Sequence, residues 1–228
     1  MRLPILLLIL FSAFGTLKAD PGDTTIVQAF TYGSDRDDII SFPDDGKSYE
    51  RILMHYTLRC VPGGAGGLQY PCGEWDYLTY TNLYDDNGER FEIGRYITPY
   101  GIGIDLGDGW TWIFDVTDYA TLLRGDKRLT AGNWQELLDL KFLFIEGTPS
   151  REVLKIQNIH TGRYDYRNSD DANQALEEKT IDFLPDTRTA KVKIRNSGHG
   201  FGGNLNCSEF CPRNNDIVIN GQVTHNQN

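Results

Sequence analysis

Two short segments of the chain place carboxylates between cysteines and aromatic residues. The first reads CGEWD at 72–76 and leads directly into a stretch rich in Tyr, Thr and Leu; the second reads CSEFC at 207–211 and follows the glycine-rich run at 198–203. Hydrolysis of an amide or glycosidic bond needs two rigidly held groups, one to manage the attacking water and one to protonate or polarise the bond. The two segments are therefore candidates for hydrolytic chemistry, although acids at turns more often only face solvent.

The four cysteines fall into two local pairs. Cys60 and Cys72 enclose one loop, and Cys207 and Cys211 enclose a shorter one. In an exported chain an even number of cysteines is typical of disulfides, and four cysteines allow three pairings, of which the two local pairs are the simplest. A four-thiolate metal site is the alternative, but these spacings do not give its usual close pair twice. We predict the two local disulfides.

The N-terminus has the pattern of a secretory signal peptide. Arg2 precedes an apolar run at 3–11, small residues follow, and Ala19 offers a cleavage point. A membrane anchor is the alternative, but the apolar run is shorter than the ~20 residues that a span needs. We therefore expect residues 1–19 to be removed and the remaining chain to be secreted, periplasmic or held at the cell surface.

The composition disfavours several classes of function. The chain has 228 residues, with 22 Lys and Arg against 32 Asp and Glu, which gives a net charge of −10. Proteins that bind nucleic acid or anionic membranes through charge need clustered cations, so neither partner is expected. A copper site is also a poor fit, because the chain has four His, none of them closely spaced, and two Met.

Alternation of apolar and polar residues between turn signals predicts an all-β fold with little helix. The clearest strands are expected at 52–60, 77–84, 91–97, 111–115 and 138–145, with a hairpin turn at 85–88. One short helix is expected at 118–124, capped by Thr117 or Asp118.

A boundary at 147–149 divides the expected domains. Residues 20–149 are predicted to form one β-sandwich, and residues 150–228 to begin a second, with strands at 153–159, 190–195 and 216–220 and a polar surface loop at 160–179. Three strands cannot cover both sheets of a sandwich. We therefore expect the second domain to be incomplete and the sequence to be a fragment.

Several motifs occur in the order seen in the peptide-N-glycosidase F family. Beginning at Cys60, they are CGEWD at 72–76, FEIGRYITPY at 91–100, DVTD at 115–118, GTP at 147–149, GHG at 198–200 and CSEFC at 207–211. The resemblance runs from about residue 57 to residue 220. It implies two side-by-side jelly-roll β-sandwiches, an architecture shared with copper monooxygenases, with the active site at their interface.

The resemblance also implies an activity and its residues. Enzymes of the family are amidohydrolases that cleave the linear amide between asparagine and the first N-acetylglucosamine of an N-linked glycan, releasing the glycan and converting Asn to Asp. Asp76 matches the principal catalytic aspartate of the family, and Glu209 matches its catalytic glutamate. The implied partner is an N-linked glycoprotein or glycopeptide; no metal or other cofactor is implied, and we expect a monomer.

Four further residues are predicted to contact the substrate. Trp75 and Trp134 offer surfaces for stacking on sugar rings, and His199 is expected to hydrogen-bond near Glu209. The stretch at 130–134 lacks the third acid of the family, and Glu136, just after it, is the candidate to replace that acid. The alternative function is a non-catalytic glycan-binding or cell-surface module, because jelly rolls also host many lectins.

Overall fold

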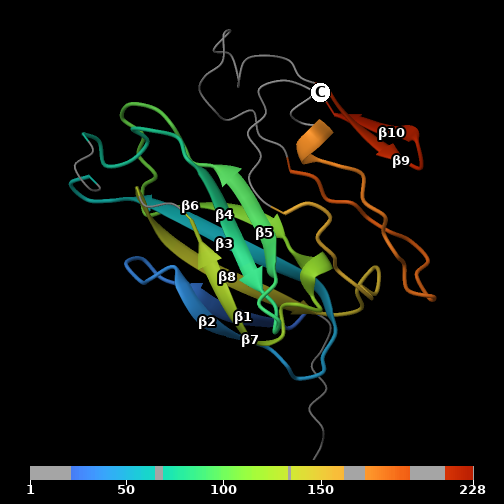
Figure 1. Cartoon of the computed structure of the whole chain (residues 1–228). Helices are drawn as coiled ribbons and strands as arrows, with labels where there is room; N and C mark the ends of the chain where they lie inside the picture. The colour runs from blue at the N-terminus through green and yellow to red at the C-terminus, as the bar shows by residue number, and fades with distance from the viewer. Residues whose placement is uncertain (1–21, 65–68, 133–134, 162–172, 196–213, 228) are drawn as a thin grey trace, which may run out of the picture.

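The computed structural model describes residues 22–64, 69–132, 135–161, 173–195 and 214–227 (Figure 1). Within these ranges the regular structure is almost entirely antiparallel strand, so the predicted all-β class is confirmed. Every helix in the same ranges falls short of the length and apolarity that a membrane crossing needs. Several predicted features lie outside the described residues, namely the signal peptide, Trp134, His199, Glu209, Cys207 and Cys211.

Eight strands form two four-stranded antiparallel sheets. In spatial order, the first sheet contains β1 (Thr24–Phe30), β8 (Glu136–Glu146), β3 (Tyr49–Cys60) and β6 (Trp110–Asp115). The second sheet contains β2 (Asp37–Phe42), β7 (Gly125–Ala131), β4 (Leu78–Tyr84) and β5 (Arg90–Ile97). The chain changes sheets at every connection except the β4–β5 hairpin. This order fits the jelly roll expected for the first domain.

The core lies between the two sheets, and β3 and β8 supply much of it. Along β3, alternate residues are buried as the sequence predicts, and Met54 and Tyr56 pair in register with Phe142 and Leu140 of β8. Phe42 of the opposite sheet meets Phe142 edge to face, with 5.1 Å between ring centroids. Burying each such side chain contributes about 1.5–3 kcal/mol. The long ladder between β3 and β8 ends where Cys60 pairs with Glu136, which brings these two residues to one end of the sandwich.

The predicted helix at 118–124 is wrong. The structure has instead a short 3₁₀ helix, η1 (Thr117–Tyr119), without a side-chain cap. The hydroxyl of Thr117 accepts a hydrogen bond from the backbone N–H of Ile52 at 3.0 Å, so it is used to join β3 to the connection after β6. The carboxylate of Asp118 faces Lys191 and Lys193.

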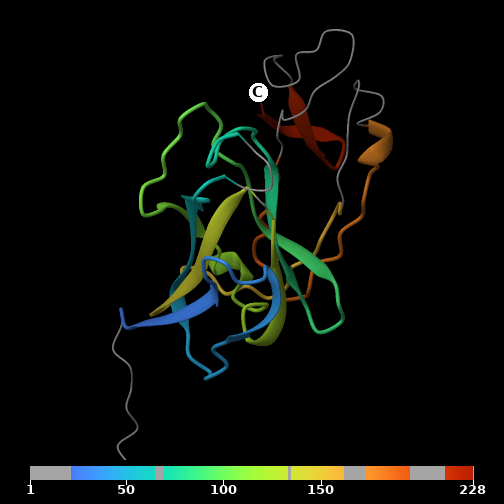
Figure 2. The ribbon, with the colours of Figure 1, turned by 90° about the vertical axis from the view of Figure 1, so that its left-hand side faces the viewer.

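The strands predicted at 153–159 and 190–195 are also wrong, because neither segment has a strand assignment or a ladder partner among the described residues. The strand expected at 216–220 is confirmed as β9 (Asn215–Ile219), which forms an antiparallel hairpin with β10 (Gln222–Gln227). In both ribbon views this hairpin lies beyond the upper end of the two sheets (Figures 1 and 2). The described residues therefore do not test the predicted second sandwich.

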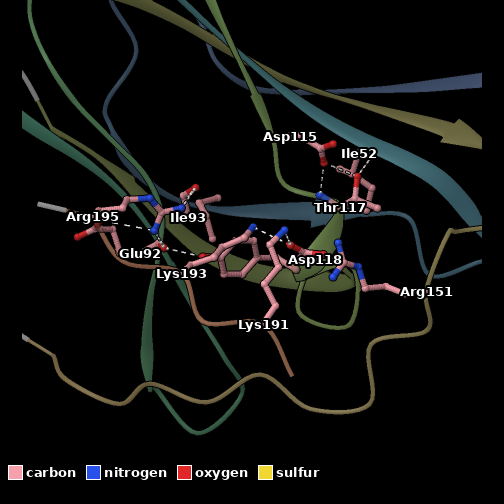
Figure 3. Close-up of polar contacts among 11 residues, drawn as sticks. Ile52, Glu92, Ile93, Asp115, Thr117, Asp118, Arg151, Lys191, Lys193 and Arg195 are labelled. Atoms are coloured by element: carbon pink, nitrogen blue, oxygen red, sulfur yellow. Dashed lines mark hydrogen bonds and ion pairs between the residues drawn. The ribbon is translucent and has the colours of Figure 1, made fainter. Parts of the chain in front are cut away.

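Side chains near residue 190 join this part of the chain to the first sandwich (Figure 3). Lys191 and Lys193 lie 2.8 and 3.0 Å from a carboxylate oxygen of Asp118, and Arg151 lies 3.5 Å from the other oxygen. Arg195 donates to the backbone carbonyls of Glu92 and Ile93 in β5, at 3.0 and 3.2 Å. The three cations of the segment at 191–195 thus contact the first sandwich, although the segment itself is not a strand.

Candidate functional site

The CGEWD segment lies at the end of the sandwich where β3 stops and β4 begins. The predicted Cys60–Cys72 disulfide is present, with 5.0 Å between the two Cα atoms, and it fastens the segment to the last residue of β3. A disulfide at these two positions leaves neither thiolate for the alternative metal site. The segment that carries the catalytic candidate, Asp76, is therefore covalently attached to the end of β3.

A close backbone contact holds the segment at Gly73. The N–H of Gly101, in the β5–β6 connection, donates to the carbonyl of Gly73 at 2.9 Å. Gly73 has a φ of +75°, and a Cβ atom there would lie 2.9 Å from the carbonyl oxygen of Gly101. Only glycine accepts both the left-handed backbone and this approach without strain. Gly73 therefore allows the β3–β4 and β5–β6 connections to lie against each other.

Gln135 and Thr98 hold the backbone on both sides of Asp76. The Gln135 amide nitrogen donates to the carbonyl of Trp75 and to the Thr98 hydroxyl, the latter at 3.3 Å. That hydroxyl accepts from the N–H of Tyr77 at 2.8 Å, and the Thr98 N–H donates to the Tyr77 carbonyl at 2.9 Å. Gln135 is 0% exposed and Thr98 is 3% exposed, so water does not compete for these bonds.

Three carboxylates act electrostatically on the phenol of Tyr77. Burial raises the pKa of Tyr77, and the negative charges of Glu74, Glu136 and Asp76 raise it further. Gln135, the residue before Glu136, also donates a hydrogen bond to the carbonyl of Trp75, the residue before Asp76. The structure thus brings the predicted replacement acid, Glu136, into the neighbourhood of Asp76, and it keeps the Tyr77 hydroxyl protonated and able to donate a hydrogen bond.

The three acids differ in their surroundings. Asp76 is half-buried, whereas Glu136 is 1% exposed at the start of β8. Glu74 accepts hydrogen bonds from the backbone N–H groups of Gln69 and Tyr70, so its carboxylate organises the loop before it. Glu74 and Asp76 are both half-buried, and of these two Asp76 is the one whose backbone is held on both sides by Gln135 and Thr98.

A cation from another loop lies beside Glu136. The guanidinium of Arg36, from the β1–β2 connection, donates to the carbonyl of Glu136, and at 3.4 Å to that of Gly132. Burial raises the pKa values of Tyr56 and Tyr96; the charge of Glu136 raises both further and that of Arg36 lowers them. Arg36, which is half-buried, therefore supplies a positive charge near an otherwise acidic site.

The predicted sugar-stacking residue Trp75 is 55% exposed, immediately before Asp76. Trp134, His199, Glu209 and the Cys207–Cys211 pair lie outside the described residues, so their roles remain predictions. Sequence reasoning missed Gln135, Thr98 and Arg36. Gln135 directly precedes Glu136, but the partners of all three depend on which strands become neighbours.

Comparisons with known proteins agree with the motifs. Residues 165–228 match the family model described as peptide-N-glycosidase F, C terminal. The chain is 29% identical over 201 residues to peptide-N(4)-(N-acetyl-beta-D-glucosaminyl)asparagine amidase F of Elizabethkingia miricola, an alignment that covers 81% of this chain and 54% of the relative. The predicted resemblance to the peptide-N-glycosidase F family is therefore confirmed.

A solved structure was also found. The crystal structure of a peptide-N(4)-(N-acetyl-beta-D-glucosaminyl)asparagine amidase superposes with a TM-score of 0.43 at 24% identity, covering 56% of this chain and 44% of that one. This chain spans about half the length of the curated relative that it matches.

Proposed function

We propose that this chain hydrolyses the amide between asparagine and N-acetylglucosamine in N-linked glycoproteins or glycopeptides. The observation that carries the proposal is the setting of Asp76: a half-buried carboxylate between two anchored residues, beside the exposed ring of Trp75 and near Glu136. The similarity to an amidase F supports the same chemistry.

In this proposal Asp76 is the primary catalytic carboxylate. It accepts a proton from the water that attacks the asparagine carbonyl carbon, and a C–O bond forms. The C–N bond then breaks as Asp76 returns this proton to the leaving nitrogen, which releases a glycosylamine and leaves a carboxyl group that ionises as aspartate in the peptide. Glu209 assists by positioning the water or polarising the substrate, with His199 beside it. Trp75 and Trp134 stack on sugar rings, and no cofactor takes part.

Glu136 has a separate role in the proposal. Its burial and its nearness to Tyr77 and Arg36 suit a group that tunes the charge of the site. A carboxylate that is 1% exposed can influence Asp76 through the low-dielectric interior more strongly than an exposed acid could. It therefore replaces the missing third acid electrostatically.

A glycan-binding module without catalysis is the second candidate. The observation that favours it is the number of exposed aromatic side chains on the loops and strand end near the site, namely Trp75 at 55%, Tyr100 at 65% and Trp110 at 61%. Aromatic faces stack on sugars whether or not chemistry follows. The two candidates differ in what happens when one oxygen of Asp76 is replaced.

The test is glycan release from a denatured N-glycoprotein by the wild type, Asp76→Asn and Asp44→Asn. Asp44 is an exposed acid in the β2–β3 connection, at the other end of β3, and serves as the matched control. The wild type and Asp44→Asn should release glycan and convert Asn to Asp in the product peptide. Asp76→Asn should keep its thermal stability and lose activity by about 10²-fold or more. A folded wild type that binds glycan but releases none would instead identify the binding module.

A further inference from the structure

A fully buried glutamine directly precedes β8, the strand that begins at Glu136. Gln135 is 0% exposed, and a side chain of similar volume, such as leucine, would fill the same space without a polar group to satisfy. Its amide nitrogen instead donates to the Trp75 carbonyl and to the Thr98 hydroxyl. A buried amide with such contacts fixes geometry as well as filling volume.

The contacts of Gln135 continue through Thr98 to the far side of Asp76. The Thr98 hydroxyl accepts from the Tyr77 N–H at 2.8 Å, and the Thr98 backbone N–H donates to the Tyr77 carbonyl at 2.9 Å. The peptide groups before and after Asp76 are therefore tied to two side chains from different strand ends, one leading into β8 and one following β5. These bonds leave the Asp76 backbone little freedom to rotate.

The orientation of a catalytic carboxylate depends on this backbone. A misplacement of about 1 Å by a change away from the reacting atoms can cost roughly 10²-fold in rate. Because Gln135 and Thr98 bond to the backbone around Asp76, they act on the reaction through that residue.

We propose that Gln135 and Thr98 form a positioning relay that sets the orientation of Asp76 for amide hydrolysis. The role in catalysis rests on the function proposed above; the relay itself rests on the hydrogen bonds. Gln135 is the positioning residue on the Trp75 side and Thr98 the one on the Tyr77 side.

The test compares Thr98→Val, Thr98→Ser and Gln135→Leu with Thr81→Val. Thr81 is a β4 threonine that is 1% exposed, so the same substitution there controls for a valine placed in the core. Thr98→Val and Gln135→Leu should each lower kcat for glycan release roughly 10- to 100-fold with KM changed less than about twofold. Thr98→Ser should restore kcat, and Thr81→Val should retain it.

The double variant Gln135→Leu/Thr98→Val gives a second measure. If the two residues work as one relay, the double variant should lose no more kcat than the worse single variant. Fully additive losses would mean two independent effects and would overturn the relay.

Hydrogen exchange separates failure of the relay from failure of the proposed function. Exchange of the Tyr77 amide, which donates to the Thr98 hydroxyl, should speed up about tenfold or more in Thr98→Val and stay unchanged in Thr81→Val. Equal exchange and equal kcat loss in both valine variants would overturn the relay. A wild type without glycan release would overturn its role in catalysis, while the exchange result would still decide whether the relay exists.

Discussion

Gly73→Ala should destabilise the chain clearly more than Gly103→Ala. The two glycines have nearly equal backbone angles, with φ of +75° and +77°. A Cβ atom on Gly73 would lie 2.8 Å from Cδ1 of Ile104 and 2.9 Å from the carbonyl oxygen of Gly101, whereas one on Gly103 would meet nothing within 4 Å. The pair therefore separates the cost of the left-handed backbone from the cost of the close contact beside the CGEWD segment.

The magnitudes follow from these two terms. An alanine in the left-handed region costs about 1–2 kcal/mol at either position. Overpacking adds about 1–3 kcal/mol at Gly73 alone, because the Gly101 carbonyl belongs to the same backbone that donates to Gly73 at 2.9 Å. The free energy of unfolding should then fall by about 1–2 kcal/mol in Gly103→Ala and about 2–5 kcal/mol in Gly73→Ala. In a chain of this size each kcal/mol lowers Tm by about 2–4 °C.

The assay is thermal unfolding of both variants and the wild type, followed by circular dichroism at neutral pH. Gly73→Ala should melt at least about 2 °C below Gly103→Ala, and it should also lose glycan release at temperatures where it is still folded. Equal melting temperatures for the two variants would refute the argument that the Gly73–Gly101 approach is tight. Loss of stability in Gly103→Ala alone would refute it more strongly.

Two further predictions concern covalent and ionic links. Reducing Cys60–Cys72, or replacing both residues by Ser, should lower the free energy of unfolding by about 2–4 kcal/mol. The midpoints of denaturant unfolding with and without reductant measure this loss of stability, and identical midpoints would contradict the prediction. Burial raises the pKa of Asp118, but the hydrogen bonds and charges of Lys191 and Lys193 outweigh it and hold the pKa below its usual 3.8. This carboxylate therefore stabilises the fold above about pH 4 and loses that contribution as pH falls through the lowered value. The stability difference between wild type and Asp118→Asn should shrink from pH 7 to pH 2, and a difference independent of pH would contradict the ion pairs.

The strands that sequence predicts best are those whose alternation reflects burial. Inward side chains alternate along the whole of β8 and along β3 from Ile52 onward, and the predicted bounds of both strands are close to those observed. β7, which reads GDKRLTA, was missed because among its residues only Leu129 is fully buried. It is a strand because β2 and β4 lie on either side of it, and no local pattern contains that information.

The candidate site was likewise predictable only where a local sequence pattern reports on it. Asp76 follows from its motif, and the burial of Glu136 could have been predicted, because it lies two residues before Leu138 on the inward face of β8. The roles of Arg36 and Thr98 could not be predicted from the sequence, because each residue reaches the site from a different connection of the chain. Contacts of this kind require the strand order to be known first.

The strand order also constrains how the chain can acquire its structure during synthesis. β1 lies at an edge of its sheet, and its neighbour there is β8, the last strand of the sandwich; β3 likewise pairs with β6 and β8. The ribosome therefore releases β1, β2 and β3 long before the partners of β1 and β3 exist. Such non-local pairing makes folding slow and leaves nascent strands open to wrong partners. The Cys60–Cys72 loop is the exception, because both cysteines emerge close together and can be oxidised before either sheet is complete.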